Sequence, residues 1–265
     1  MSWTNYHSHT NYCDGTNTPE DYIRKALELE MPVYGFSSHA PVPFFDCKWA
    51  MKMDDLEGYC DEIYRLKKKY EDRIEILLGM EVDYIPDKMG PTADFLQTAG
   101  LDDAVGSIHF VDAFKGGKGW EIDGTLDVFK KGLFEIFDGN VEAAVRRYYE
   151  LTREMIEEDC PEIIGHLDKI KMQNLREHFF SEDEAWYREE VMNTLEDVRS
   201  RIQIRSEFKG RVVGLNISSV GGVVRPGQVL MEIVPDSAEL IVEAIVPPRA
   251  IDIVRSGQDA RIRLT

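Results

Sequence analysis

The sequence predicts an α/β protein in two parts, a parallel sheet or barrel over residues 1–196 and a smaller all-β segment over residues 197–265. In the first part, short apolar runs alternate with apolar residues at helical spacing, which is typical of parallel sheets. After about residue 201, β-branched segments punctuated by glycine and proline replace this alternation. Charge and residue usage change at the same place.

The elements of the first part follow one another as strand, helix, strand. Apolar runs predict strands at residues 3–9, 33–38, 74–82, 103–110 and 162–167. Apolar residues at helical spacing predict helices at residues 19–30, 54–70, 125–137, 141–158 and 182–200. Thr18 and Pro19 favour the start of the first helix, because threonine caps helices well and proline suits the first helical position.

The second part differs from the first in charge and in residue usage. Residues 197–265 carry ten lysines and arginines against eight aspartates and glutamates, a net charge of +2. Residues 1–196 carry 21 against 41, a net charge of −20. The second part also contains no histidine, cysteine, tryptophan or tyrosine, and the GG and PG pairs of GGVVRPGQVLMEIVP predict turns. We therefore expect a domain boundary at residue 196.

The composition restricts the partners and the compartment. A net charge of −18 disfavours an extended nucleic-acid surface, but it allows a small phosphorylated substrate held by metal ions. Cys13, Cys47, Cys60 and Cys160 show no C-x-x-C spacing, which indicates a reducing compartment rather than a disulfide framework. The sequence shows no charged-then-apolar leader and no apolar run of bilayer length, so we expect a cytoplasmic protein without a membrane segment.

Five of the six histidines lie at or near the ends of predicted strands. A single histidine in such a place is more often structural, and a His-x-His pair near a terminus is often a solvated turn. In an extended segment, however, alternate side chains share a face, and the strand ends of a barrel converge on one rim. The candidate metal ligands on this rim are His7, His9, Asp14, His39, Glu81, His109 and His166.

These ligand types predict chemistry on phosphate esters. Mixed imidazoles and carboxylates suit Zn, Mn or Fe, and seven are too many for one tetrahedral ion, so we expect two or three divalent transition metals. Such clusters hold phosphate oxygens and generate an attacking hydroxide. Lys115 and Lys118, in the loop FKGGKGW, are candidates for binding the substrate phosphate, with a solvated loop as the alternative. Asp168 is a candidate to orient a ligand or to act as general acid, and His178 is interpreted as a surface residue.

The segments YHSHTNYCDG, GFSSHAP, GMEVDY, GSIHF and GHLD resemble, in this order, the motifs of the PHP (polymerase and histidinol phosphatase) family. SSHAPVPF and HFVDAFKGGKGWEIDG resemble its histidinol-phosphatase branch. The resemblance covers residues 1–196 and implies a distorted (β/α)7 barrel whose trinuclear site hydrolyses L-histidinol phosphate to L-histidinol and phosphate in histidine biosynthesis. It implies that His7 and His9 bind one metal ion, that Glu81 bridges to a second completed by His109 and His166, and that Asp14 and His39 hold a third.

The sequence departs from this family towards the end of its first part. The family places its last two ligands, an aspartate and a histidine two residues apart, on a strand near the C-terminus, whereas here no histidine follows His178. We therefore expect a barrel that lacks its last strands and a phosphatase whose activity is impaired. Because open strand edges invite pairing, a homo-oligomer is a further expectation.

Residues 197–265 resemble a different family, the membrane fusion proteins that act as periplasmic adaptors in type I secretion. The segment GGVVRPGQVLMEIVP is the most distinctive, and the resemblance implies part of a lipoyl-like domain and the start of the β-barrel that follows it. Two alternative functions follow for the whole chain. One is a PHP-type phosphodiesterase or exonuclease, which the charge of the first part disfavours, and the other is a non-catalytic fusion that carries a secretion-adaptor fragment.

Overall fold

The computed structural model describes residues 3–202, 209–214, 229 and 231–235. The chain forms two compact units, which divide between residues 204 and 205. This division lies close to the boundary expected at residue 196, although helix α6 (Ala185–Ile202) runs through that position. The boundary at residue 196 stays a prediction.

Four parallel strands form the main sheet of the first unit, in the order β1-β2-β3-β6. These strands are β1 (Val33–His39), β2 (Glu75–Asp83), β3 (Asp103–Ser107) and β6 (Ile163–Ile164). Their register sets His39 beside Glu81 and Glu81 beside Val105. The predicted α/β unit with a parallel sheet is thus confirmed, whereas among the described residues this sheet is open, with β1 and β6 as its edges.

Two expected strands differ in the structure. Residues 3–9 form only an isolated bridge at Asn5, although they run beside β1, where the N–H of Gly35 donates to the carbonyl of Asn5 at 2.7 Å. The strand expected at residues 103–110 is divided into β3 and β4 (Phe110–Ala113). Strand β4 pairs antiparallel with β5 (Gly119–Glu121), so that a separate two-stranded hairpin follows the main sheet.

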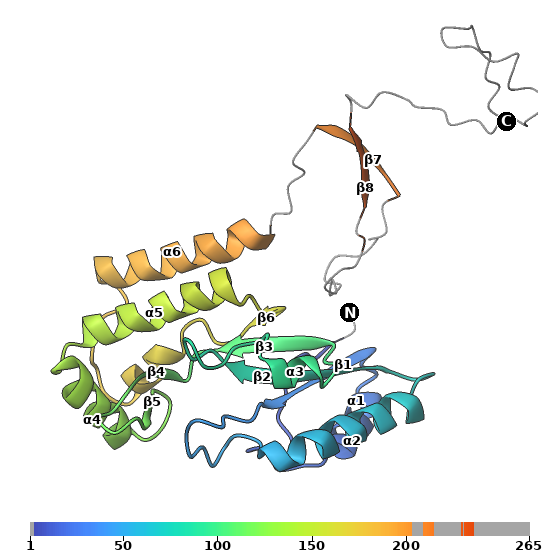
Figure 1. Cartoon of the computed structure of the whole chain (residues 1–265), viewed down its shortest axis with the longest axis horizontal. Coiled ribbons are helices and arrows are strands. Elements are labelled where there is room, and N and C mark those ends of the chain that lie inside the picture. Colours follow the sequence, from blue (N-terminus) through green and yellow to red (C-terminus); the bar gives the residue numbers. More distant parts are fainter. Residues whose placement is uncertain (1–2, 203–208, 215–228, 230, 236–265) are drawn as a thin grey trace, which may run out of the picture. The chain divides into compact units, whose positions relative to one another are not determined.

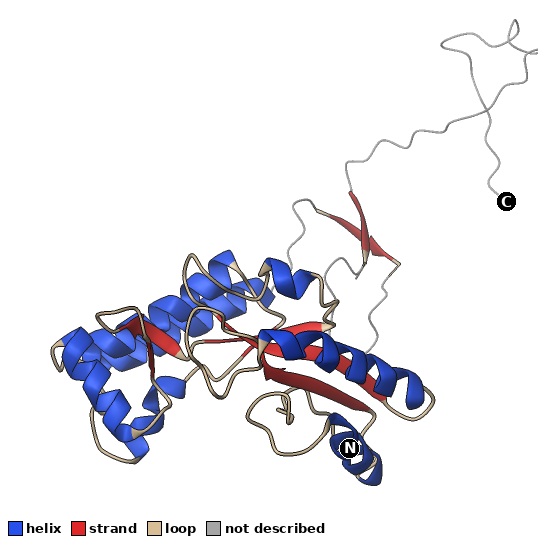
Figure 2. Cartoon of the chain, turned by 60° about the horizontal axis from the view of Figure 1, so that its bottom comes forward, coloured by secondary structure: helices blue, strands red, loops and turns tan. Residues whose placement is uncertain are grey.

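Helices cover the two sides of the main sheet, as Figures 1 and 2 show. Helices α1 and α2 lie along one face, and α5 and α6 lie side by side across the other, with α4 near the β4–β5 hairpin. Thr18 caps α1 through a reciprocal hydrogen-bonded capping box with Asp21, as its position before Pro19 suggests. The helices of the first unit are α1 (Pro19–Glu28), η1 (Met53–Asp55), α2 (Leu56–Lys69), α3 (Asp94–Gln97), α4 (Leu126–Phe137), α5 (Val141–Glu158), η2 (Lys169–Leu175) and α6.

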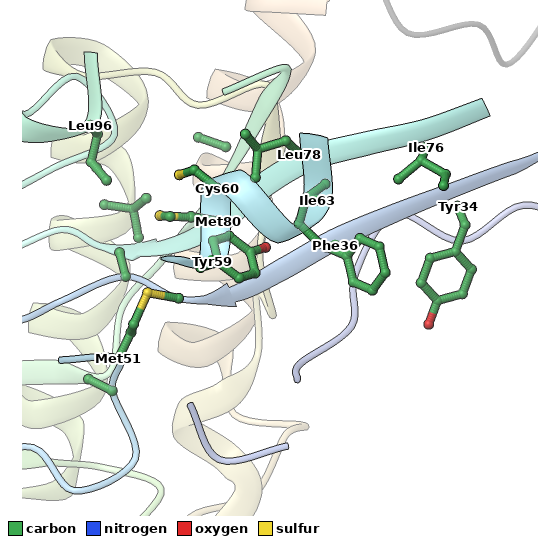
Figure 3. Packing of buried hydrophobic residues seen from close by; sticks show 14 of the residues in the cluster. Tyr34, Phe36, Met51, Tyr59, Cys60, Ile63, Ile76, Leu78, Met80 and Leu96 are labelled. Carbon is green, nitrogen blue, oxygen red and sulfur yellow. The ribbon is translucent and has the colours of Figure 1, made fainter. Parts of the chain in front are cut away.

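The main hydrophobic core lies between the sheet and helices α1 and α2. Alternate side chains of a strand point to opposite faces, so Ile76, Leu78 and Met80 of β2 pack towards α2 while Glu81 points to the other face. Figure 3 shows this packing around Ile63 of α2. Burying each such apolar side chain contributes roughly 1.5–3 kcal/mol to folding. The opposite face of the sheet is therefore free to carry polar side chains.

A second hydrophobic cluster joins the β4–β5 hairpin to α4, α5 and α6. Trp120 of β5 is fully buried and packs against Phe129 of α4, with ring centroids 5.5 Å apart. Tyr148 and Tyr149 of α5 are each 1% exposed within the same cluster. This cluster holds α5 in place beside the segment that follows β6.

In the second unit, the described residues form an antiparallel pair of strands, β7 (Gly210–Val213) and β8 (Glu232–Pro235). They agree with the β character expected for this part of the sequence. The turns expected at the GG and PG pairs of GGVVRPGQVLMEIVP, and the β-branched segments expected after residue 235, lie outside the described residues. None of the helices that the structure describes is long and apolar enough to cross a membrane.

Candidate metal centre

Glu81 lies at the centre of the histidine cluster. It stands near the end of β2, its side chain is completely buried, and it points to the face of the sheet away from the main core. Five histidines approach its two carboxylate oxygens from different segments of the first unit. The nitrogen–oxygen distances to Glu81 are 3.8 Å for His7, 2.9 Å for His9, 3.3 Å for His39, 3.5 Å for His109 and 3.3 Å for His166.

The structure brings all seven candidate ligands together in overlapping groups. Within each group, the possible ligand atoms lie within 4.8 Å of one another. Each group combines imidazole nitrogens with at least one carboxylate, which is a donor set that suits Zn, Mn or Fe. The groups are His7 with His9 and Glu81, His9 with Asp14 and His39, His39 with Asp83 and His109, and Glu81 with His109 and His166.

The segment that carries the first two histidines is held against β1 by hydrogen bonds with the hydroxyl of Ser37. The hydroxyl of Ser37 lies 2.7 Å from Nδ1 of His7 and accepts the N–H of Ser8 at 2.9 Å. Two residues further on, Nδ1 of His9 lies 2.7 Å from Asp14 while its Nε2 faces Glu81. Burial would lower the pKa of His9, but the hydrogen bonds with Glu81 and Asp14 outweigh it and raise that pKa.

Asp83 is a member of the cluster that the sequence interpretation missed. It is buried at the end of β2, and its Oδ1 lies 3.0 Å from Nδ1 of His109. Burial would lower the pKa of His109, but Asp83 outweighs it and raises that pKa to about 9. The signal was present, because Asp83 follows Glu81 by two residues and so shares its face of the strand.

Two buried ring nitrogens in the cluster, Nδ1 of His39 and Nε2 of His109, have no hydrogen-bond partner among the residues that the structure describes. Buried polar atoms are nearly always paired, so such atoms indicate that something else binds there. Burial lowers the pKa of His39 to about 3 and that of His166 to about 4, which keeps both imidazoles neutral and able to bind a metal ion. Burial would raise the pKa of Glu81, but the hydrogen bond from His9 and the nearby imidazoles lower it, so Glu81 is a carboxylate. The donor set therefore fits divalent metal ions.

An ion pair that the sequence interpretation also missed lies beside the cluster. Nζ of Lys169, at the start of η2, is 3.1 Å from Oδ2 of Asp123, and the same oxygen lies 4.0 Å from Nε2 of His109. Lys169 and Asp123 are only 21% and 24% exposed. The two residues are 46 positions apart in the sequence. No local sequence pattern could therefore have predicted that they form an ion pair.

The three remaining candidate residues lie in other surroundings. Lys115 and Lys118 line a cavity of about 310 Å³ at the end of the β4–β5 hairpin, together with Phe114 and Lys131. The carboxylate of Asp168 is 2.9 Å from Nζ of Lys171 and faces a larger cavity, of about 440 Å³, between α5, α6 and η2. His178, interpreted as a surface residue, is exposed.

Most of the chain matches the sequence model of one known family. Residues 5–203 match the PHP domain family. The chain belongs to this family. Its first part resembles the histidinol-phosphatase of Bacillus subtilis, with 32% identity over 184 residues, covering 62% of this chain and 65% of that protein. The chain spans only 56 to 65% of the length of the curated histidinol-phosphatase relatives that it matches.

Two solved structures resemble the PHP unit. A protein assigned as the histidinol phosphatase hisK of Listeria monocytogenes has a TM-score of 0.63 and 29% identity, covering 75% of this chain and 79% of that one. The histidinol phosphate phosphatase of Lactococcus lactis, solved with zinc, L-histidinol and phosphate, has a TM-score of 0.56 and 21% identity, covering 75% and 70%. At that identity, the second likeness shows the fold alone.

The C-terminal part has a separate set of relatives. The type I secretion system membrane fusion protein PrsE of Rhizobium meliloti is 39% identical over 77 residues, which cover 29% of this chain and 18% of that protein. The two resemblances read from the sequence are therefore both confirmed. The chain combines a PHP unit with a fragment similar to a membrane fusion protein.

Proposed function

We propose that the PHP unit is a metal-dependent phosphomonoesterase of the histidinol-phosphatase type, which hydrolyses L-histidinol phosphate to L-histidinol and phosphate. The observation that carries this proposal is the convergence of five histidines on the buried carboxylate of Glu81. Two or three divalent ions, Zn, Mn or Fe, would supply a hydroxide nucleophile and polarise the phosphate. The resemblance to the histidinol-phosphatase of Bacillus subtilis, at 32% identity over 184 residues, supports this choice of substrate.

We assign the metal ligands from the overlapping groups. His7, His9 and Glu81 would hold one ion, Glu81, His109 and His166 a second, and Asp14 and His39 a third. Other residues keep these ligands in position. Asp83 binds Nδ1 of His109 and so directs Nε2 of that ring to the cluster, and the hydroxyl of Ser107 donates to Glu81 at 2.7 Å.

We propose Lys169 as the residue that holds the substrate phosphate over this cluster. After burial itself, the positive charge of Lys169 is among the causes that lower the pKa values of His7 and His166, so it acts at the cluster. Asp123 keeps the ammonium group in place through its 3.1 Å ion pair. A phosphate above the metal ions would accept hydrogen bonds from Lys169.

Three earlier candidates keep secondary roles in this proposal. Lys115 and Lys118 would attract the anionic substrate from the β4–β5 hairpin, whose two ends carry His109 and Asp123. Asp168 would orient η2, which begins with Lys169, because its carboxylate binds Lys171. A role of Asp168 as general acid is the alternative, and Asp168→Asn with a pH–rate profile separates the two.

The test compares two histidine variants of the full chain. His9→Ala removes a ligand shared by two groups, whereas His178→Ala removes an exposed histidine outside the cluster. We expect His9→Ala to lower the hydrolysis of L-histidinol phosphate by about 10²-fold or more, since losing even an outer partner of a ligand costs about 10–100-fold. His178→Ala should leave the rate unchanged. A purified wild-type chain with less than one equivalent of transition metal, or equal rates in both variants, would contradict the proposal.

Substrate comparison separates the alternatives within the family. A phosphomonoesterase hydrolyses p-nitrophenyl phosphate but not bis(p-nitrophenyl) phosphate, whereas a phosphodiesterase shows the reverse preference. Impaired turnover stays a prediction. It is tested by comparing the rate of L-histidinol phosphate hydrolysis with that of the Bacillus subtilis enzyme under the same conditions. A distorted (β/α)7 barrel that lacks its last strands, a homo-oligomer and a cytoplasmic location also stay predictions, and size-exclusion chromatography tests the oligomer.

A further inference from the structure

The backbone of His166 has an unusual conformation. Its φ angle is +27°, on the left-handed side that residues other than glycine rarely adopt. Strand β6 ends two residues earlier, and η2 begins three residues later, so the chain changes direction at His166. A conformation of this kind is kept only where neighbouring contacts hold it, and such contacts are often found at functional sites.

The carbonyl oxygen of His166 is held by two donors. The hydroxyl of Tyr148 donates to it at 2.6 Å, and the N–H of Lys169 donates to it at 3.0 Å. Tyr148 is 1% exposed in the middle of α5, so its ring is fixed by packing. Burial raises the pKa of the Tyr148 hydroxyl, which favours the protonated, donating form of this group.

The turn at His166 determines where its side chain points. The N–H of the preceding Gly165 donates to the carbonyl of Gly106 at 2.8 Å, which brings the end of β6 close to β3. A side chain at position 165 would lie 2.1 Å from the hydroxyl of Ser107. With the backbone reversed directly after this close approach, Nε2 of His166 lies 3.3 Å from Glu81.

We propose that Tyr148 is a positioning residue of the metal centre, whose hydroxyl holds the left-handed turn at His166 and thereby aims this imidazole at the ion shared with Glu81 and His109. Tyr148 acts through the carbonyl of His166, to which its hydroxyl donates. In this proposal, helix α5 sets the direction of the His166 imidazole, which the sheet alone does not fix. The proposal rests on the metal site proposed above.

The chain offers a matched control on the same helix. Tyr149 is also 1% exposed, and its hydroxyl donates to the hydroxyl of Tyr187 at 3.4 Å, within the second cluster. Tyr148→Phe and Tyr149→Phe therefore each remove one buried hydroxyl from α5, but only the first change frees His166. In Tyr148→Phe the carbonyl of His166 keeps the N–H of Lys169, so it is not left without a partner.

The first measurement is Zn²⁺ affinity of the full chain, by competition with a coloured chelator. We expect Tyr148→Phe to weaken the binding of one equivalent by about 10-fold or more, the effect of losing an outer partner of a ligand, and Tyr149→Phe to change it by less than about 2-fold. Cobalt-substituted protein should show an altered d–d spectrum in Tyr148→Phe alone. Equal effects in the two variants, or none in either, would overturn the proposal.

The second measurement does not depend on metal. The metal-free protein contains only six histidines, so histidine labelled with ¹³C and ¹⁵N gives a simple spectrum in which His166 is assigned by its loss in His166→Gln. Backbone ¹³C shifts report φ, and we expect those of His166 to move in Tyr148→Phe and to stay in Tyr149→Phe. If the wild type binds no Zn²⁺, the proposed function fails. If His166 does not shift in Tyr148→Phe, the role of Tyr148 fails.

Discussion

Asp103, at the start of β3, is a buried carboxyl group that should make the PHP unit less stable as the pH rises. It is 2% exposed, and within the described part of the chain neither of its oxygens has a hydrogen-bond partner. Burial, and then the negative charges of Asp102 and Glu162, raise its pKa from 3.8 to about 7, while Lys67 only partly offsets them. The group therefore keeps its proton in the folded chain at pH values at which the unfolded chain has lost it.

The sign and the size of the effect follow from this shift. Between pH 3.8 and about 7 the folded state binds one proton more than the unfolded state, so the free energy of unfolding falls as the pH rises. One pKa unit corresponds to about 1.4 kcal/mol, so the full shift costs about 4 kcal/mol above pH 7. Between pH 5.5 and pH 8.5 the loss through Asp103 should be about 2 kcal/mol.

Urea unfolding followed by tryptophan fluorescence measures this loss, because Trp120 is fully buried. In the Asp103→Asn variant, the asparagine at this position has no proton to lose. Between pH 5.5 and pH 8.5 the free energy of unfolding of this variant should therefore fall by about 2 kcal/mol less than that of the wild type. The difference between the two pH profiles is the quantity tested, because it cancels the other titrating groups. Asp72→Asn, at an exposed position, should run parallel to the wild type. Parallel profiles for Asp103→Asn and the wild type would refute the reasoning.

Four further predictions concern the metal centre and the packing. Glu81→Gln removes the carboxylate that the histidines share, and metal analysis should show at least one equivalent fewer bound than in the wild type; unchanged metal content would contradict its bridging role. Ser107→Ala removes the hydroxyl that donates to Glu81 and should weaken Zn²⁺ binding about 10-fold in chelator competition. Gly132→Ala should lower stability by about 1–3 kcal/mol in urea unfolding, because the new carbon would lie 2.1 Å from Trp120. Gly58→Ala, where the nearest atom is 3.8 Å away, should instead raise it by up to about 1 kcal/mol.

The sequence alone determined the class of the first unit and most residues of the histidine cluster. Short apolar runs ended in polar residues at His39 and Glu81, and parallel strands place such ends on one edge of a sheet. The helix expected at residues 141–158 has those bounds in the structure, since strong helical spacing over five turns leaves little room for another conformation. The change in charge at residue 196 likewise indicated two parts, which the separate sets of relatives confirm.

Strand ends were less predictable, because side chains far apart in the sequence decide them. The run expected at residues 103–110 stops at Ser107, since the N–H of His109 donates to the carboxylate of Asp83 rather than to a neighbouring strand. The strand expected at residues 162–167 is reduced to Ile163–Ile164, because the chain turns sharply at His166. The spacing of apolar residues in the sequence predicts neither of these two strand ends.

The parts of the site that position its ligands were decided by tertiary structure alone. Asp123 meets Lys169, and the hydroxyl of Tyr148 meets the carbonyl of His166, across distances in sequence that carry no pattern. Each of these contacts depends on where a helix packs against the sheet, and packing is set by the whole core rather than by local residues. The sequence thus determined which side chains could bind metal ions, and only the fold decided how those side chains are aimed.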